Sequence, residues 1–175
     1  MEFLVRQIQA EDFEPVWKVG DRAYVPRLPE SFECFCSKFR AYPKGCLSCV
    51  VRGQIVGYGI SHPWKGNCVP LNTVISDAGA GLPLPEDPDC YYFHDFSILP
   101  EFQGKGLGAA LASVGFNIAL SNGFREIRLV SVNRSKAFWM KMGFLATRMT
   151  EYGPDIDGNM VPAYCMSKTF TPVPL

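Results

Sequence analysis

The sequence lacks long apolar runs and a surplus of charge, and it holds few histidines. Its 175 residues carry 17 basic and 17 acidic side chains and only two histidines. The balanced charge argues against nucleic acid or an anionic membrane as the main partner, because both require an excess of lysine and arginine. No apolar run approaches the roughly 20 residues that span a bilayer. We therefore expect no membrane-spanning helix.

The first residues also lack the pattern of a secretion signal. Met1 to Gln7 contain an early acid and no basic segment followed by a long apolar stretch. We therefore expect a soluble, cytoplasmic protein. At this length, with 47% apolar and 19% charged residues, we expect one domain over residues 1–175 with a substantial hydrophobic core.

Seven cysteines raise the question of a metal site or disulfides. They are Cys34, Cys36, Cys46, Cys49, Cys68, Cys90 and Cys165. The odd number, without a secretion signal, favours reduced thiols. Cys46 and Cys49 have the spacing of a zinc ligand pair, but Cys34 and Cys36 are separated by one residue only, which fits a zinc loop poorly. We favour buried thiols and expect no bound metal.

Apolar periodicity and chain breakers predict an α/β fold. Strands are expected at residues 3–9, 46–52, 54–62, 91–99, 126–132, 144–151 and 161–169, and helices at residues 11–25, 30–42, 104–122 and 135–142. Residues 63–89 are rich in proline, glycine and aspartate and predict a long loop, whose length suggests a functional role. The sequence has no internal repeat and no linker.

Gln103–Gly108 is the segment that indicates chemistry. Three glycines at alternate positions follow a predicted strand and open a predicted helix. Glycine lets a ligand approach the backbone closely, and the first turn of a helix offers unpaired amides at the positive end of its dipole. The segment therefore predicts a phosphate cradle in which backbone amides do most of the binding and Lys105 adds charge.

Two nucleotide-binding loops share part of this pattern. It is not an ATP-binding Walker loop, because no Gly-Lys-Ser/Thr follows. Gly104, Gly106 and Ala109 match the dinucleotide pattern Gly-x-Gly-x-x-Gly/Ala, which predicts an NAD(P)-dependent protein. In that fold, however, the loop follows its strand directly, whereas residues 100–103 intervene here. A glycine-rich turn without a ligand is the remaining alternative.

The same segment resembles a known family. Gln103-Gly-Lys-Gly106-Leu-Gly108 is similar to the Gln/Arg-x-x-Gly-x-Gly/Ala acyl-CoA signature of the GNAT superfamily of acetyl-CoA-dependent N-acetyltransferases. Residues 94–100 resemble its fourth strand. Asn133, Phe138-Trp139, Lys141 and Gly143-Phe144 resemble its closing segment, although the spacing differs by about one residue from commoner versions. The close match covers residues 91–144, and the element order extends it to nearly the whole chain.

The resemblance implies a fold and a cofactor site. The fold would be a mixed, mostly antiparallel central sheet flanked by helices, with a V-shaped split between the fourth and fifth strands that admits the pantetheine arm of acetyl-CoA. Residues implied to bind the cofactor are Phe96, Ser97 and Ile98 through their backbone, Gln103, Gly104, Lys105, Gly106, Leu107 and Gly108 around the pyrophosphate, Asn133 after the fifth strand, and Trp139 against the arm.

The resemblance also implies direct transfer of an acetyl group from acetyl-CoA to an amine. This reaction requires a base for the ammonium proton. His94 is the first candidate, because histidine titrates near neutral pH; a histidine bonded only within the sheet is the structural alternative. Asp95 and Tyr92 are further catalytic candidates. Regular alternation along the strand predicts Tyr92, His94 and Phe96 on one face and Phe93, Asp95 and Ser97 on the other.

Trp139 is the departure from the family pattern. Many members have a tyrosine there, whose hydroxyl protonates the leaving thiolate, whereas an indole N–H only donates a hydrogen bond. The acid is then Tyr92, Ser135, Tyr152 or Tyr164, or the thiolate leaves into water. This departure sustains an alternative function, an acyl-CoA-binding module without catalysis. The acceptor amine, a small molecule or a protein amino group, stays open, as does a homodimer.

Overall fold

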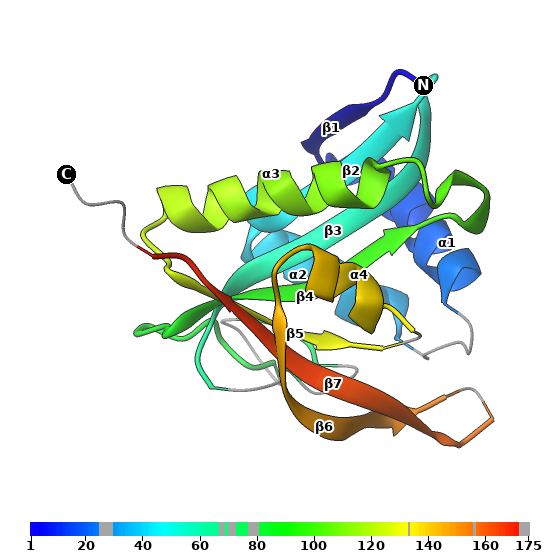
Figure 1. Ribbon diagram of the computed structural model, residues 1–175. Helices are drawn as coiled ribbons and strands as arrows, with labels where there is room; N and C mark the ends of the chain where they lie inside the picture. The colour runs from blue at the N-terminus through cyan, green and yellow to red at the C-terminus, as the bar shows by residue number, and fades with distance from the viewer. Residues whose placement is uncertain are drawn as a thin grey trace.

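Seven strands form one continuous sheet in the computed structural model of the chain (Figure 1). Their order is β1-β2-β3-β4-β5-β7-β6, and all neighbours are antiparallel except β4 and β5. The strands are β1 (Leu4–Gln7), β2 (Cys46–Val51), β3 (Gln54–Trp64), β4 (Cys90–Ile98), β5 (Glu126–Ser131), β6 (Leu145–Pro154) and β7 (Met160–Thr169). The structure describes residues 1–24, 30–66, 69, 73–76, 81–132, 134–155 and 157–171. The mixed, mostly antiparallel sheet is confirmed.

Helices cover both faces of this sheet. They are α1 (Phe13–Ala23), α2 (Phe32–Ala41), α3 (Leu107–Ser121) and α4 (Lys136–Lys141). Figure 1 shows α3 and α4 in front of the sheet and α1 and α2 behind it. None of the helices in the described part of the chain is long and apolar enough to cross a membrane.

Local sequence explains where the helices begin. The Ser31 side chain accepts the Cys34 amide and caps α2. The helix predicted from residue 104 begins only at Leu107, because Gly104 and Gly106 have φ of +71° and +84°, outside the helical region. Gly123, with φ of +85°, follows the end of α3. The two positive-φ glycines therefore keep the loop before α3 out of the helix.

The hydrophobic core has two parts, one on each side of the sheet. Behind it, α1 and α2 pack on β2 and β3 through a cluster that includes Val16, Phe35, Phe39, Val56 and Ile60. In front, α3 and α4 pack on β4, β5 and β7 through a cluster that includes Phe93, Ala112, Leu129, Trp139 and Met166. The central strands are buried on both faces as a result, and polar side chains there need partners.

A β-bulge in β4 makes the predicted alternation of its side chains wrong. Ile60 on β3 pairs with Asp95, but the next residue, Ser61, pairs with Phe93, so His94 is an extra residue in the ladder. An extra residue shifts the alternation by one position. Phe93 and Phe96 consequently stack on the same face, with ring centroids 4.4 Å apart.

The contacts of the bulge residues show which face each occupies. The ring of Phe93 lies against α3, where a Cβ on Gly115 would be 2.7 Å from it. His94 lies near Glu30, and Asp95 bonds Tyr58, on the side of α1 and α2. His94 and Asp95 therefore share one face of the sheet, rather than lying on opposite faces as the alternation predicts.

The cysteines that the structure describes are all unbridged. Cys34 and Cys36 lie on α2, Cys46 and Cys49 on β2, and all four are buried. Burial raises the pKa of Cys34 and Cys49 to about 11. Among the described residues, no group of three or more histidine, cysteine or acidic side chains could hold a metal ion. Cys68 lies outside the described residues.

Candidate functional site

The sheet opens between β4 and β5. The two strands pair in parallel over three residue pairs only, from Tyr91 opposite Ile127 to Phe93 opposite Leu129. β4 then continues to Ile98. Within the described part of the chain, no strand pairs with this edge of β4 beyond Phe93. The outer part of β4 therefore presents a free sheet edge, which is a template for an extended ligand.

Backbone groups of Phe96 and Ile98 face this gap. The amide of Leu99 donates to the carbonyl of Val56 on β3, at 2.9 Å. Because successive residues of a strand direct their backbone groups to opposite edges, Ser97 also faces β3, whereas Phe96 and Ile98 face away from it. The Ile98 carbonyl accepts the Nε2 of Gln103 at 2.9 Å. Of the three strand residues predicted to bind a cofactor, two therefore turn their polar backbone toward the gap.

The loop Gln103–Gly108 ends this strand and begins α3. A Cβ added to Gly104 or Gly106 would meet nothing within 4 Å, so the space over the loop is open. The first helical bond runs from the Ala110 amide to the Gly106 carbonyl. The amides of residues 107–109 come before that bond and have no acceptor within the helix. The first turn of α3 carries no acidic side chain, so this helix end suits an anion.

Lys105 is turned back onto the chain rather than toward the helix amides. Its Nζ donates to the Glu101 carbonyl at 2.7 Å and lies 5.3 Å from the centre of the Phe102 ring. Glu101 in turn pairs with Arg22 of α1 at 2.9 Å. The backbone amides are therefore the groups of this loop best placed for an anion.

Trp139 lies in the core in front of the sheet and is 6% exposed. Its ring contacts four phenylalanine rings with centroid distances between 4.8 and 6.0 Å; they are Phe93, Phe96, Phe138 and Phe144. Through Phe96 it supports the strand that borders the gap. Asn133, the other residue predicted near the cofactor on this side, lies outside the described residues.

The opposite face of β4 carries a carboxyl group bonded by two phenols. Asp95 accepts a hydrogen bond from Tyr58 of β3 at 2.6 Å and another from Tyr24, which follows α1. Burial raises the pKa of Asp95 to about 6, although the two phenols favour its charged form. Asp95 is therefore held in place and titrates close to neutrality.

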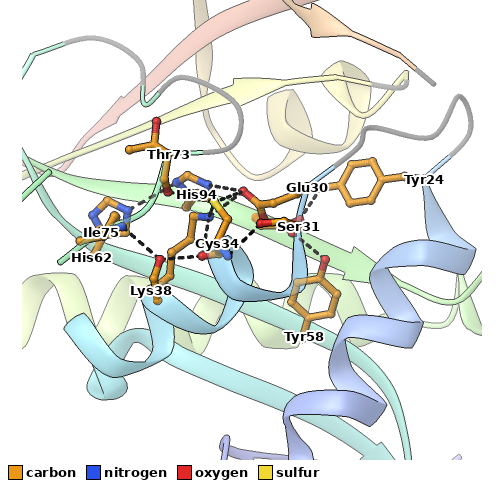
Figure 2. Close-up of polar contacts among 12 residues, drawn as sticks. Tyr24, Glu30, Ser31, Cys34, Lys38, Tyr58, His62, Thr73, Ile75 and His94 are labelled. Atoms are coloured by element: carbon orange, nitrogen blue, oxygen red, sulfur yellow. Dashed lines mark hydrogen bonds and ion pairs between the residues drawn. The ribbon is translucent and has the colours of Figure 1, made fainter. Parts of the chain in front are cut away.

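His94, next along the bulge, lies between a second histidine and a glutamate (Figure 2). Its Nδ1 is 3.5 Å from Nε2 of His62 on β3, and its Nε2 is 3.9 Å from Oε1 of Glu30. The side chain of His94 is 3% exposed. Burial lowers its pKa, and Lys38 lowers it further. Tyr92 lies on the same face, with its ring 5.9 Å from that of His94.

Glu30 is fixed by an ion pair with a buried lysine. Nζ of Lys38 lies 2.6 Å from Glu30 Oε1, and the lysine side chain is 0% exposed. Lys38 also donates to the Cys34 carbonyl at 3.2 Å. Burial opposes the charge of Glu30, but His94 and Lys38 outweigh it and lower the pKa of Glu30 to about 2. A charged carboxylate therefore faces His94.

The buried histidines make stability depend on pH. Burial lowers the pKa of His62 to about 3, below the ordinary value of about 6.5. Below that ordinary value the unfolded chain binds more protons than the folded one, so the stability that neutral His62 contributes is lost as the pH falls. Asp95 acts in the opposite direction, because its folded pKa is raised and the folded protein binds the extra proton.

We expect His62→Gln to reduce the loss of stability in acid. Between about pH 6 and pH 5, the free energy of unfolding should change with pH by about 1.4 kcal/mol per unit less than in the wild type. Urea unfolding at several pH values measures both slopes, and the contribution of Asp95, present in both proteins, cancels. Equal slopes in the two proteins would mean that His62 is already protonated in the folded state.

Sequence reasoning missed several members of this site. The sequence predicts Lys38 in a helix and Tyr58 in a strand without a role for either, and it gives no indication that Glu30 contacts His94. A signal existed for Lys38, since it shares a helix face with Cys34 and Phe35, which are apolar. For Tyr58 and Glu30 there was none, because their contacts with β4 depend on the pairing of distant segments.

The sequence matches a family model, and the fold matches solved structures. A family model described as "Acetyltransferase (GNAT) family" matches residues 4–144. Among curated proteins, none matches the sequence.

Solved structures of the same fold cover nearly the whole chain. The loading GNATL domain of CurA from Lyngbya majuscula has a TM-score of 0.80 and 16% identity, covering 97% of this chain and 98% of its own. The ribosomal-protein-S18-alanine N-acetyltransferase from Escherichia coli has a TM-score of 0.70 and 16% identity, covering 99% and 97%. Arabidopsis thaliana Naa50, in complex with the bisubstrate analogue CoA-Ac-MVNAL, has a TM-score of 0.71 and 14% identity, covering 97% and 100%.

Proposed function

Because this chain belongs to the GNAT acetyltransferase family, we propose that it transfers the acetyl group of acetyl-CoA to a primary amine by direct attack in a ternary complex. The observation that carries the proposal is the arrangement along β4. Beyond Phe93 one edge of the strand is unpaired in the described part of the chain, the glycine loop follows the strand, and His94 projects from it toward α2. A thioester donor and a base are thereby brought to one strand.

The loop and the strand edge fit the donor. Amides of residues 107–109 are suited to the pyrophosphate, and the open space over Gly104 and Gly106 admits it. Backbone groups of Phe96 and Ile98 are suited to the amides of the pantetheine arm, as if the arm were an added strand. Gln103 ties the loop to Ile98 and so holds these two parts of the site together.

His94 is the proposed base. His94 Nε2 first takes the ammonium proton, directly or through water, and the neutral amine nitrogen then forms a bond to the carbonyl carbon of the thioester. The C–S bond breaks, and the second proton of the nitrogen passes to the departing thiolate or to water. The thiolate needs no dedicated acid to depart. Its conjugate thiol has a pKa of about 8.5, so a thiolate is a far better leaving group than an alkoxide. Asp95, with its pKa near 6, is the second candidate base.

We expect Trp139→Phe to affect stability more than turnover. Its ring is surrounded by phenylalanines, so the smaller ring should leave a cavity and lower the free energy of unfolding by about 1–3 kcal/mol. Turnover should stay within about tenfold of the wild type. Urea unfolding and thiol release measure the two effects.

The half-buried Trp17 of α1, on the other side of the sheet, supplies a control. Trp17→Phe measures the effect of losing an indole that does not contact the front face of β4. If Trp139→Phe abolished turnover while CoA still bound normally, the indole N–H would have a chemical role.

Thiol release from acetyl-CoA in the presence of an amine panel tests the proposed function. The panel contains small amines, polyamines, aminoglycoside-like amines and peptides with free N-termini. Release that depends on one amine class supports the transferase. Thermal protection by CoA without release for any amine would instead support the alternative, a module that binds acyl-CoA without catalysis. Protection by NAD(P) but not by CoA would contradict both.

A further inference from the structure

Hydrogen-bond geometry determines where the protons lie on the two histidines. Nδ1 of His62 lies 2.9 Å from the carbonyl of Pro63. A carbonyl only accepts hydrogen bonds, so the ring proton of His62 is on Nδ1. His62 is 1% exposed, and no acidic side chain among the described residues bonds it, so its ring is neutral and its Nε2 is an acceptor.

The tautomer of His62 determines that of His94. Nε2 of His62, an acceptor, faces Nδ1 of His94 at 3.5 Å. The His94 proton therefore lies on Nδ1, and the lone pair lies on Nε2. The basic atom of His94 is thus the one that faces Glu30.

The carboxylate of Glu30 is positioned to stabilise the protonated ring. Oε1 lies 3.9 Å from His94 Nε2, too far to bond the neutral ring but close enough to favour a positive charge on it. Lys38 bonds the same oxygen and keeps Glu30 charged. Figure 2 shows Lys38, Glu30 and His94 in one continuous group of contacts that ends at His62.

We propose that His62 and Glu30 are positioning residues for His94: His62 fixes the tautomer that leaves Nε2 basic, and Glu30, held by Lys38, stabilises the imidazolium that forms when the acceptor loses its proton. The inference rests on the proposed function for its kinetic consequence only. The tautomers and the proton affinity of His94 are properties of the protein alone.

Charged and titratable groups reach His94 from every element around it. Glu30 before α2 and Lys38 on α2 act on its charge directly, and the rings of His62 on β3 and Tyr92 on β4 lie beside it. Farther out, Cys34 on α2 contacts Glu30 and Lys38, and Asp95 on β4 is bonded by Tyr58 of β3 and by Tyr24 after α1. Lys38 opposes a charge on His94 and Glu30 favours it. Removing the charge of Glu30 and removing that of Lys38 should therefore shift the titration of His94 in opposite directions.

Nitrogen NMR of the uniformly ¹⁵N-labelled chain tests the tautomers. The chain contains only two histidines, so one substitution, His62→Gln, assigns both rings. We expect both rings to carry their proton on Nδ1 near neutral pH. His94 found with its proton on Nε2 would overturn the proposal, whatever the enzyme does.

A cycle of charge variants tests Glu30. In Glu30→Gln the midpoint of His94 titration, and with it the acidic limb of kcat/KM, should fall by about one pH unit, a tenfold loss of proton affinity. In Lys38→Met it should rise. The exposed Glu33 of α2 supplies the control, because Glu33→Gln should change neither value. Shifts in one direction only, or none, would show that the ion pair is merely structural.

Each single variant leaves one buried charge without its partner, which can destabilise the fold. A double variant that removes both charges is therefore measured as well. Glu30→Gln combined with Lys38→Met removes both charges and should keep the fold, with a His94 midpoint between those of the single variants. A midpoint outside that range would contradict the assignment of opposing effects.

Substitution of His62 tests the tautomer by kinetics. In His62→Phe, His94 loses the acceptor at Nδ1, so its tautomers should mix and kcat should fall about 10–100-fold with KM for acetyl-CoA unchanged. His62→Gln should restore much of kcat, because an amide oxygen can accept the same proton. Equal kcat in the Phe variant and the wild type would overturn the role of His62. Absence of acetyl transfer by the wild type would instead contradict the proposed function and leave the NMR result standing.

Discussion

Replacing His94 by glutamine should lower kcat/KM by about 10²–10⁴-fold, the range for loss of a positioned general base. Glutamine preserves the size of the side chain but cannot accept a proton near neutrality. In the wild type kcat/KM should rise with pH and level off once His94 is neutral. Because burial and Lys38 lower the pKa of His94, this limb should lie below the ordinary value of about 6.5. Steady-state kinetics over a range of pH measure it.

Asp95→Asn is the matched comparison for this variant. It changes the neighbouring residue on the same face of the bulge and leaves His94 in place. CoA affinity should survive in both variants, because the glycine loop lies beyond Pro100 in the chain. If His94→Gln kept the wild-type rate and pH limb while Asp95→Asn lost them, Asp95 would be the base and His94 structural.

Gly106→Val should weaken CoA binding by about 100-fold or more, equivalent to about 2.7 kcal/mol. The added side chain would occupy the open space over the loop, where a pyrophosphate must approach the helix amides. Isothermal titration with CoA measures the affinity directly, and thermal protection by CoA should decline in parallel.

Gly123 provides a control that separates strain from ligand exclusion. It has φ of +85°, close to the +84° of Gly106, and a Cβ there also meets nothing within 4 Å, but it lies at the far end of α3. Gly123→Val should therefore cost similar backbone strain and leave CoA affinity unchanged. Undiminished affinity in Gly106→Val would remove the loop from the cofactor site.

Local patterns were sufficient to predict the loop and most elements of the fold. The glycines at 104 and 106 carry their own signal, because positive φ and an open surface require glycine whatever surrounds them. The helices and strands follow from apolar periodicity, which is also local. The split between β4 and β5 was anticipated through the family resemblance, not through periodicity.

The acid–base group could not be predicted in the same way. A bulge adds one residue opposite a particular partner, so its position at His94 depends on how β3 and β4 align, which no property of β4 alone reveals. The contact between Glu30 and His94 joins segments more than 60 residues apart. The regular alternation failed for this reason, and it separated His94 from Asp95 although both face α1 and α2.

Because β4 and β5 pair over only three residue pairs, the sheet consists of two parts that are joined by a short run of backbone hydrogen bonds. One part contains β1 to β4, and the other contains β5, β7 and β6. A ligand that hydrogen-bonds along β4 adds contacts between the two parts of the sheet. Its binding should therefore also stabilise their association. In hydrogen exchange, the amides of Phe96 and Ile98 should become protected on CoA binding, and amides shared by β2 and β3 should change little. Bound CoA would then serve as an additional, removable strand of the sheet, and the ligand-free protein would lack that strand.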